Sequence, residues 1–292
     1  METAREGFIA VEGGRAWYRI AGDGPGVPLI ALHGGPGISH EYLEPLAARG
    51  DERLIVFYDQ LGGGRSDRPD DDSLWTVERF VRELALVRDH FALDEVHILG
   101  QSWGTMLAVD YVLDHSAGVH SLILGDACLS VERWARDADA LIAALPEPER
   151  AIIQRHLDAG TYDAPEYLAA LGAFHRRHLC RVRPWPEALV RSALHMNRHV
   201  YEAMWGPTDF YATGATRGYD RTPRLHELAM PVLFLCGRYD SATPETTDWY
   251  RSLVPDAEMA VFEESSHVPM NEEPEAFVRT VRDFLGRVER TG

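Results

Sequence analysis

Several features are scarce or missing in this sequence of 292 residues. No apolar stretch approaches the roughly 18 residues that a membrane span needs, so we expect no membrane partner. The first residues lack the apolar run of a secretory signal, and we expect a cytoplasmic protein. The three cysteines are odd in number and far apart in the chain. This pattern argues against disulfide and zinc frameworks and favours reduced thiols.

Positive charge is also scarce, because the formal net charge is −17. An acidic surface repels phosphate backbones, so we expect no nucleic-acid partner. The same field mildly favours cationic substrates, although solubility is the simpler interpretation. The chain has no H-E-x-x-H, no paired C-x-x-C and no P-loop, so we expect neither a metal nor a nucleotide cofactor. Nothing in the sequence indicates an oligomeric state.

Hydrophobic residues make up 45% of the chain, enough for one large α/β domain with an insertion. Short apolar runs typical of strands alternate with helical patterns along most of the sequence. The expected strands cover residues 8–12, 16–21, 28–32, 54–58, 96–99, 122–124, 232–235 and 258–262. This alternation predicts a mostly parallel central sheet with helices on both faces.

The alternation stops between about residues 130 and 227, where we find no convincing strand. Here we expect helices over 141–157, 165–180 and 186–204, and an amphipathic helix over 274–289 closes the chain. A helical block inserted into such a sheet is most simply a cap over the strand ends where ligands bind. We therefore predict an α/β core over 1–127 and 228–292 and a helical cap domain over 128–227.

Ser102 stands in the pentapeptide G-Q-S-W-G, between the expected strand 96–99 and a helix that continues through 107–113. A G-x-S-x-G sequence at a strand-to-helix junction is the nucleophile elbow of the α/β-hydrolase fold. Gly100 and Gly104 would relieve crowding in this sharp turn, and the helix N-terminus favours negative charge. The chemistry indicated is acyl transfer through a serine ester.

A serine nucleophile needs a base and an acid, which follow it in this fold in the order Ser, acid, His on loops after strands. Asp240 follows the strand at 232–235 in the sequence G-R-Y-D. His267 lies after the last expected strand and before the closing helix. We predict that Ser102, Asp240 and His267 are the catalytic residues. His33, beside two glycines, is expected to stabilise a loop instead.

The oxyanion of an acyl-transfer intermediate needs two preorganised N–H donors. Trp103, directly after the nucleophile, is expected to supply one from its backbone. The other should come from H-G-G-P-G at 33–37, with Gly35 as the first choice and Gly34 as the second. A serine at the elbow argues against epoxide hydrolase and haloalkane dehalogenase chemistry, because those lineages use an aspartate there.

Four motifs together resemble the proline iminopeptidase family, a branch of the α/β-hydrolases that also contains L-amino acid amidases. They are H-G-G-P-G at 33–37, D-Q-x-G-x-G-x-S at 59–66, G-Q-S-W-G at 100–104 and G-R-Y-D at 237–240. The resemblance runs from about residue 7 to residue 288. It implies that Ser102, Asp240 and His267 form the triad, and that the substrate is an amide or ester with a free α-amine.

Members of this family hold the amine with carboxylates near the triad and on the cap. In one branch a glutamate follows the catalytic aspartate and another lies in a G-P-x-E-F segment, whereas this chain has Ser241 and Asp209 there. A desolvated amine still needs a counter-charge. We expect Asp209 to supply it, with Asp126 as the second candidate and Glu245, which also suits a helix start, as the third. The changed positions predict a substrate other than an ordinary N-terminal proline peptide.

Aromatic side chains near these motifs are candidates for the walls of an apolar acyl pocket, although such residues are as often plain core. They are Trp103, Trp205, Phe210, Tyr211 and Tyr239. We predict an aminoacyl hydrolase acting on a short peptide, a small molecule or a natural product. A carboxylesterase with no amine requirement is the alternative. A non-catalytic ligand-binding relative is the third, and the complete set of triad candidates argues against it.

Overall fold

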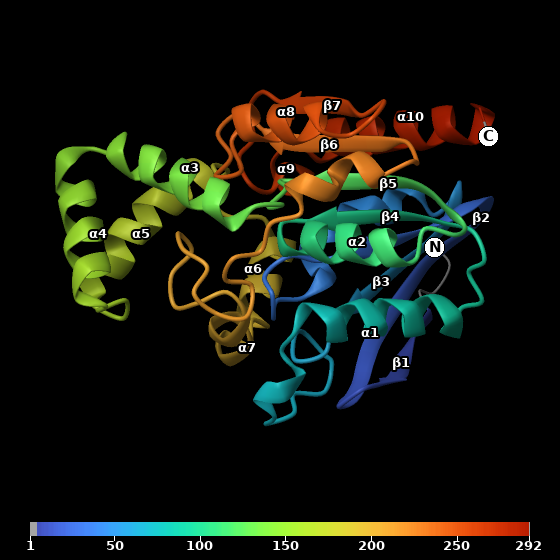
Figure 1. Ribbon diagram of the computed structural model, residues 1–292, viewed down its shortest axis with the longest axis horizontal. Coiled ribbons are helices and arrows are strands. Elements are labelled where there is room, and N and C mark those ends of the chain that lie inside the picture. Colours follow the sequence, from blue (N-terminus) through green and yellow to red (C-terminus); the bar gives the residue numbers. More distant parts are fainter. Residues whose placement is uncertain (1–4, 292) are drawn as a thin grey trace.

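A seven-stranded sheet forms the centre of the structure, a computed structural model that describes residues 5–291 (Figure 1). The pairs β2–β4, β4–β5, β5–β6 and β6–β7 are parallel, whereas β1 and β3 run antiparallel to β2. The mostly parallel sheet is therefore confirmed. The strands are β1 (Arg5–Val11), β2 (Gly14–Leu32), β3 (Arg53–Asp59), β4 (Val96–Gln101), β5 (Val119–Gly125), β6 (Val232–Gly237) and β7 (Glu258–Phe262).

The long strand β2 joins two segments that the sequence predicts as separate strands. Its pairing with β3 shifts register between Ala21 and Leu29. Glycines allow the chain to stay in the sheet there, because a Cβ added to Gly22 would lie 2.2 Å from the Cα of Gly50. The polar, glycine-rich sequence resembles a loop, and only the close backbone crossing makes it part of a strand.

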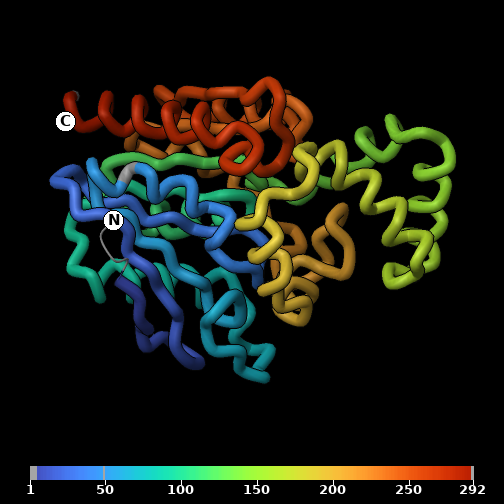
Figure 2. Tube along the Cα trace, turned by 180° about the vertical axis from the view of Figure 1, so that it is seen from behind, coloured from blue at the N-terminus to red at the C-terminus, as the bar shows by residue number. Residues whose placement is uncertain are grey.

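Helices cover both faces of the sheet, as predicted. Ile98 in β4 packs into the apolar cluster that contains α1 (Val77–His90), α2 (Trp103–Asp114) and Tyr250 of α8 (Pro244–Ser252). Its neighbour Leu99 packs into the opposite cluster, with η1 (His40–Arg49) and α10 (Pro274–Thr291). Successive strand residues point to opposite faces, so continuous apolar runs serve both clusters. Figure 2 shows α10 lying along the sheet.

The segment between β5 and β6 is helical, as expected, but the helices are shorter. The predicted helix 141–157 is wrong, because the chain breaks at 144–146, where Pro146 disfavours helical geometry in the residue before it. The predicted helix 186–204 divides where Asn197 caps a new helix by accepting from the His199 N–H. The helices are α3 (Val131–Ala143), α4 (Glu147–Ala159), α5 (Pro165–His178), α6 (Glu187–Leu194) and α7 (Arg198–Met204), followed by η3 (Thr222–Glu227).

The pair α4–α5 stands away from the sheet in both views (Figures 1 and 2). These helices and α3 share a small apolar cluster that includes Ile153 and Phe174. The division into a core and a cap at 127/128 and 227/228 stays a prediction. Two short elements, η2 (Asp72–Leu74) and α9 (Pro269–Glu272), complete the structure. Within residues 5–291, none of the helices combines the length and the apolar character that crossing a membrane requires.

Candidate active site

Ser102 occupies a sharp turn between β4 and α2, with a φ of +53° and a ψ of −119°. A non-glycine residue in this region is strained by about 1–3 kcal/mol and persists only where its surroundings fix it. Here a Cβ on Gly100 would lie 2.2 Å from the Gly104 oxygen, and a Cβ on Gly104 would lie 2.4 Å from the Leu32 oxygen. The structure therefore has the predicted elbow, and it requires both glycines.

His267 and Asp240 meet on the loops after β7 and β6. The Nδ1 atom of His267 lies 2.7 Å from Oδ1 of Asp240, and the Asp240 side chain is fully buried. The same Oδ1 accepts the Ala242 N–H at 2.9 Å. A carboxylate acceptor fixes the proton of a neutral imidazole on Nδ1, which leaves Nε2 free to accept another.

A cavity of about 320 Å³ joins Ser102, His267 and Asp209. Its lining therefore combines residues of the sheet loops with residues of the inserted helices. Most of its remaining wall is apolar, and Trp134 presents its ring edge-on to the His267 ring at 5.8 Å. Apolar side chains that line it include Ile38, Phe174, Leu179, Trp185, Leu189 and Met196.

Asp209 brings a negative charge into this cavity. Its Oδ2 lies 2.6 Å from Nε2 of His175, and its Oδ1 accepts the Tyr201 hydroxyl at 2.9 Å. Burial opposes the charge of this carboxyl, but the bonds to His175 and Tyr201 outweigh burial and lower the pKa of Asp209. The side chain keeps 39% of its surface exposed. An ionised carboxylate is thus available to a ligand in the cavity.

The glycine loop after β2 lies beside the elbow. A Cβ on Gly34 would lie 3.1 Å from the Cβ of Ser102, and Gly35, with a φ of +104°, lines the cavity. The Gly34 N–H already donates to the Tyr42 hydroxyl at 2.7 Å. Gly34, the second choice for an oxyanion donor, therefore does not fit that role. Trp103 is the first residue of α2, so its N–H has no acceptor within the helix.

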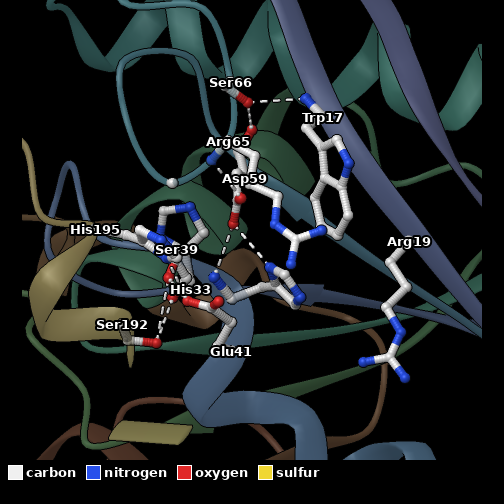
Figure 3. Close-up of polar contacts among 12 residues, drawn as sticks. Trp17, Arg19, His33, Ser39, Glu41, Asp59, Arg65, Ser66, Ser192 and His195 are labelled. Atoms are coloured by element: carbon white, nitrogen blue, oxygen red, sulfur yellow. Dashed lines mark hydrogen bonds and ion pairs between the residues drawn. The ribbon is translucent and has the colours of Figure 1, made fainter. Parts of the chain in front are cut away.

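Hydrogen bonds tie the motif D-Q-x-G-x-G-x-S to the start of η1 and to β2 (Figure 3). Asp59 accepts the backbone N–H of His40 at 2.9 Å, the His40 ring at 2.8 Å and the Arg65 N–H at 2.9 Å. Burial disfavours this charge, but the bonds to His40 lower the pKa of Asp59 overall. Ser66 donates to the Asp59 carbonyl and accepts the Trp17 N–H at 2.8 Å. The motif is therefore a structural support rather than part of the cavity.

His33 also supports the loop, as expected. Its Nε2 accepts the Gln60 N–H at 3.0 Å and its Nδ1 donates to the Gly34 carbonyl at 2.9 Å. Burial lowers the pKa of His33, so the ring is neutral. Farther along, the buried Glu41 binds Ser39 at 2.6 Å and His195 at 2.8 Å, which joins η1 to the chain after α6 (Figure 3).

Comparisons with known proteins agree with this geometry. A family model described as the α/β hydrolase fold matches residues 27–274. A curated proline iminopeptidase from Heyndrickxia coagulans is 44% identical over 97% of this chain and 99% of its own length. Another from Saccharolobus solfataricus is 33% identical over 98% of this chain and 94% of its own. The chain belongs to the proline iminopeptidase family. The resemblance inferred from the motifs is therefore confirmed.

Two solved structures are similar to nearly the whole chain. The proline iminopeptidase of Mycobacterium smegmatis is 34% identical, with a TM-score of 0.91 over 98% of this chain and 99% of its own. VinJ is also 34% identical, with a TM-score of 0.93 over 97% of this chain and 99% of its own. The protein is thus an α/β hydrolase and an enzyme of the hydrolase class.

The aromatic residues proposed as pocket walls divide into two groups. Trp103, Trp205 and Phe210 line the cavity, and Phe210 packs edge-on against Phe174 at 5.0 Å. The other two predictions are wrong. Tyr211 turns away and donates to Asp139 at 2.5 Å. Tyr239 is 40% exposed and lies beneath the Arg181 guanidinium at 3.6 Å, so its ring is held on the surface.

Two of the three candidate amine ligands lie outside the cavity lining. Glu245 is exposed in the first turn of α8, where a carboxylate suits the helix N-terminus. Asp126 is completely buried at the end of β5 and receives the Gln101 amide at 3.0 Å. Both are corrected, because neither side chain reaches the cavity. Asp209 is the candidate that the structure places there.

Several residues around the cavity were not predicted from the sequence. His175 and Tyr201 hold Asp209, but both lie in helices whose polar residues face solvent as often as they face a ligand. Trp134 covers His267, and no motif marks it. Gln101, inside the elbow motif, donates to Asp126 at 3.0 Å and to the His267 carbonyl at 2.9 Å. Its place beside the nucleophile was the one available signal.

Proposed function

We propose that this protein is a serine hydrolase that removes an amino acid with a free α-amine from the amino end of a peptide or small molecule. The observation that carries the proposal is the joint presence of Ser102, His267 and Asp209 in one cavity, and the lowered pKa of Asp209 favours its charged form. The relatives named proline iminopeptidases support it independently.

The reaction follows from the roles that the geometry supports. Ser102 Oγ attacks the substrate carbonyl while His267 Nε2 takes its proton, and Asp240 stabilises the imidazolium through Nδ1–H. The backbone N–H groups of Gly35 and Trp103 hold the oxyanion. Collapse expels the leaving amine, which receives the proton from His267. Water then attacks the acyl-enzyme by the same route and releases the free amino acid.

Amine recognition is assigned to Asp209. A protonated α-amine close to this carboxylate would gain a charge-assisted hydrogen bond in a largely apolar cavity. The apolar and aromatic wall would receive the amino-acid side chain and part of the leaving group. Ser241 also lines the cavity, in the position that carries a glutamate in one branch of the family. We therefore propose a substrate range that is not restricted to N-terminal proline and includes aminoacylated natural products.

One observation favours a second candidate function, an esterase without an amine requirement. His175 Nε2 lies 2.6 Å from Oδ2 of Asp209, so this carboxylate already has a hydrogen-bond partner. Its role could then be to hold the cavity wall together rather than to bind a substrate amine. In that case the enzyme would hydrolyse esters and amides whether or not they carry a free amine. The first function requires a positively charged amine next to the scissile carbonyl of the substrate, and the second does not.

A matched substrate panel tests the proposal. Free and N-acetylated p-nitroanilides of alanine, proline and phenylalanine are assayed beside p-nitrophenyl acetate. We expect cleavage of the free anilides that disappears on acetylation, and loss of turnover in Ser102→Ala by about 10⁴-fold or more. Equal cleavage of free and acetylated substrates would establish the esterase. No turnover, together with no labelling of Ser102 by a fluorophosphonate, would leave a ligand-binding protein.

A further inference from the structure

Two carboxyl groups approach each other behind the cavity, and each has one oxygen with no hydrogen-bond partner. Asp126 and Asp240 are buried, with exposed fractions of 0% and 1%. The unpartnered atoms are Oδ1 of Asp126 and Oδ2 of Asp240. One carboxyl oxygen of each residue and a ring nitrogen of His267 lie within 4.8 Å of one another. Two buried carboxylates this close cannot both keep a negative charge without compensation.

Gln101 cannot supply the missing hydrogen bond. Its Oε1 accepts the Tyr42 hydroxyl at 2.7 Å, and this contact fixes the orientation of the amide. Its Nε2 has two protons, and both are used, one on Oδ2 of Asp126 at 3.0 Å and one on the His267 carbonyl at 2.9 Å. The simplest remaining arrangement is a hydrogen bond between the two unpartnered oxygens themselves, which requires a proton on one carboxyl.

The surroundings determine which carboxyl carries that proton. Asp240 accepts His267 Nδ1 at 2.7 Å and the Ala242 N–H at 2.9 Å, and both bonds stabilise its charged form. Asp126 receives a single bond from a neutral amide. Burial raises the pKa of Asp126 well above its ordinary value, and the charge of Asp240 raises it further. These surroundings therefore stabilise a negative charge on Asp240 but not on Asp126.

Every titratable group that faces Asp126 agrees with this assignment or leaves it unchanged. Glu272, on α9, adds to the rise in its pKa. Tyr42, on η1, and Cys236, on β6, are buried, and burial raises the pKa of both, so they stay neutral. His267 already binds Asp240.

We propose that Asp126 is a neutral carboxylic acid that donates its proton in a hydrogen bond to Oδ2 of Asp240, as a positioning residue for the His267–Asp240 pair. Asp126 has a φ of +53°, and its N–H donates to the Leu235 carbonyl at 2.7 Å, so a backbone conformation that is unusual for aspartate aims the side chain. A carboxylic acid kept neutral by its site to act as a donor is a known enzymatic device.

The inference rests on the proposed function, because it concerns the same base. One net negative charge beside His267 allows the imidazole to accept the Ser102 proton and release it again. Two charges would over-stabilise the imidazolium and hold the base in its protonated form at neutral pH. The neutral state of Asp126 therefore sets the pH range in which the pair works.

The test compares Asp126→Asn, which keeps a neutral donor of the same shape, with Asp126→Leu, which keeps the size but has no donor. We expect the asparagine variant to retain kcat within about threefold and the acid limb of its kcat/KM profile to coincide with that of the wild type. The leucine variant should lose roughly 10- to 100-fold in kcat with little change in KM. Its acid limb should move to higher pH, because the charge of Asp240 is then less dispersed.

A shift of the acid limb to lower pH by about one unit or more in Asp126→Asn would overturn the proposal, because it would reveal a charged Asp126 in the wild type. Infrared difference spectra of wild type minus Asp126→Asn give a readout that needs no activity. We expect the C=O band of a protonated carboxylic acid, and its absence would also overturn the proposal. Loss of wild-type activity in chelator, restored by a divalent ion, would do so as well, since a cation would then bridge the carboxylates.

Failure of this proposal is distinguishable from failure of the proposed function. If the protein hydrolyses p-nitrophenyl acetate but ignores the amine, the pH profiles are measured on the ester and still decide the state of Asp126. If Ser102 is not labelled by a fluorophosphonate, the catalytic proposal fails while the infrared band still reports the proton. Thermal unfolding of both variants shows whether a loss in kcat follows from unfolding.

Discussion

Replacing Asp209 by asparagine would remove the negative charge from the cavity while it keeps the shape of the side chain. The asparagine oxygen can still accept the Tyr201 hydroxyl, which lies 2.9 Å from Oδ1 in the wild type. Its amide can still hydrogen-bond to the ring of His175, whose Nε2 lies 2.6 Å from Oδ2 in the wild type. The cavity should therefore stay intact, and the variant isolates the effect of charge on the substrate amine.

The size of the effect follows from the environment of this carboxylate. Two unit charges 4 Å apart interact by about 4 kcal/mol at an effective dielectric constant of 20. Desolvation of the amine offsets part of this, and hydrogen bonds to charged groups contribute about 1.5–3 kcal/mol net. We expect kcat/KM for free-amine substrates to fall by roughly 10- to 150-fold in Asp209→Asn, mostly through KM.

The assay compares alanine p-nitroanilide with p-nitrophenyl acetate in wild type, Asp209→Asn and a matched control. Asp139→Asn is that control, because Asp139 is an exposed carboxylate of α3 that binds Tyr211 and does not line the cavity. The control should behave as the wild type on both substrates. Equal losses on anilide and ester in Asp209→Asn, or no loss on either, would refute the assignment of the amine to this carboxylate.

Two further predictions concern stability. Gly100→Ala should lower the unfolding free energy by about 2–3 kcal/mol, measured by urea denaturation, because its Cβ would lie 2.2 Å from the Gly104 oxygen. Gly172→Ala, a helical control whose Cβ would have a nearest atom 3.6 Å away, should be neutral or stabilising, and equal losses would contradict the packing argument. Burial, aided by the charge of Arg53, lowers the pKa of His97 from 6.5 to about 4. As the pH falls, His97 therefore becomes protonated in the unfolded chain before it does so in the folded protein. His97 should therefore cost up to about 3 kcal/mol of stability between pH 6.5 and 4, and His97→Gln should flatten that part of the profile; parallel profiles would show that His97 is not responsible.

Local pattern was enough to predict much of the fold. Short apolar runs predicted the strands, and alternation with helical patterns predicted a mostly parallel sheet with helices on both faces. The errors lie where local signals are weak. The glycine-rich stretch inside β2 resembles a loop, and the helical segment at 141–157 has apolar residues on both sides of the break at Pro146.

The sequence by itself determined the parts of the site that depend on order along the chain. The elbow around Ser102 and the positions of Asp240 and His267 after their strands follow from motif and spacing, because parallel strands bring their carboxyl ends to one edge. Tertiary structure alone decided where the other carboxylates point. Asp209 reaches the cavity because the inserted helices fold back over the elbow, whereas the Asp126 side chain lies fully buried behind Asp240. Side-chain direction in such places is set by long-range packing, which no short stretch of sequence encodes.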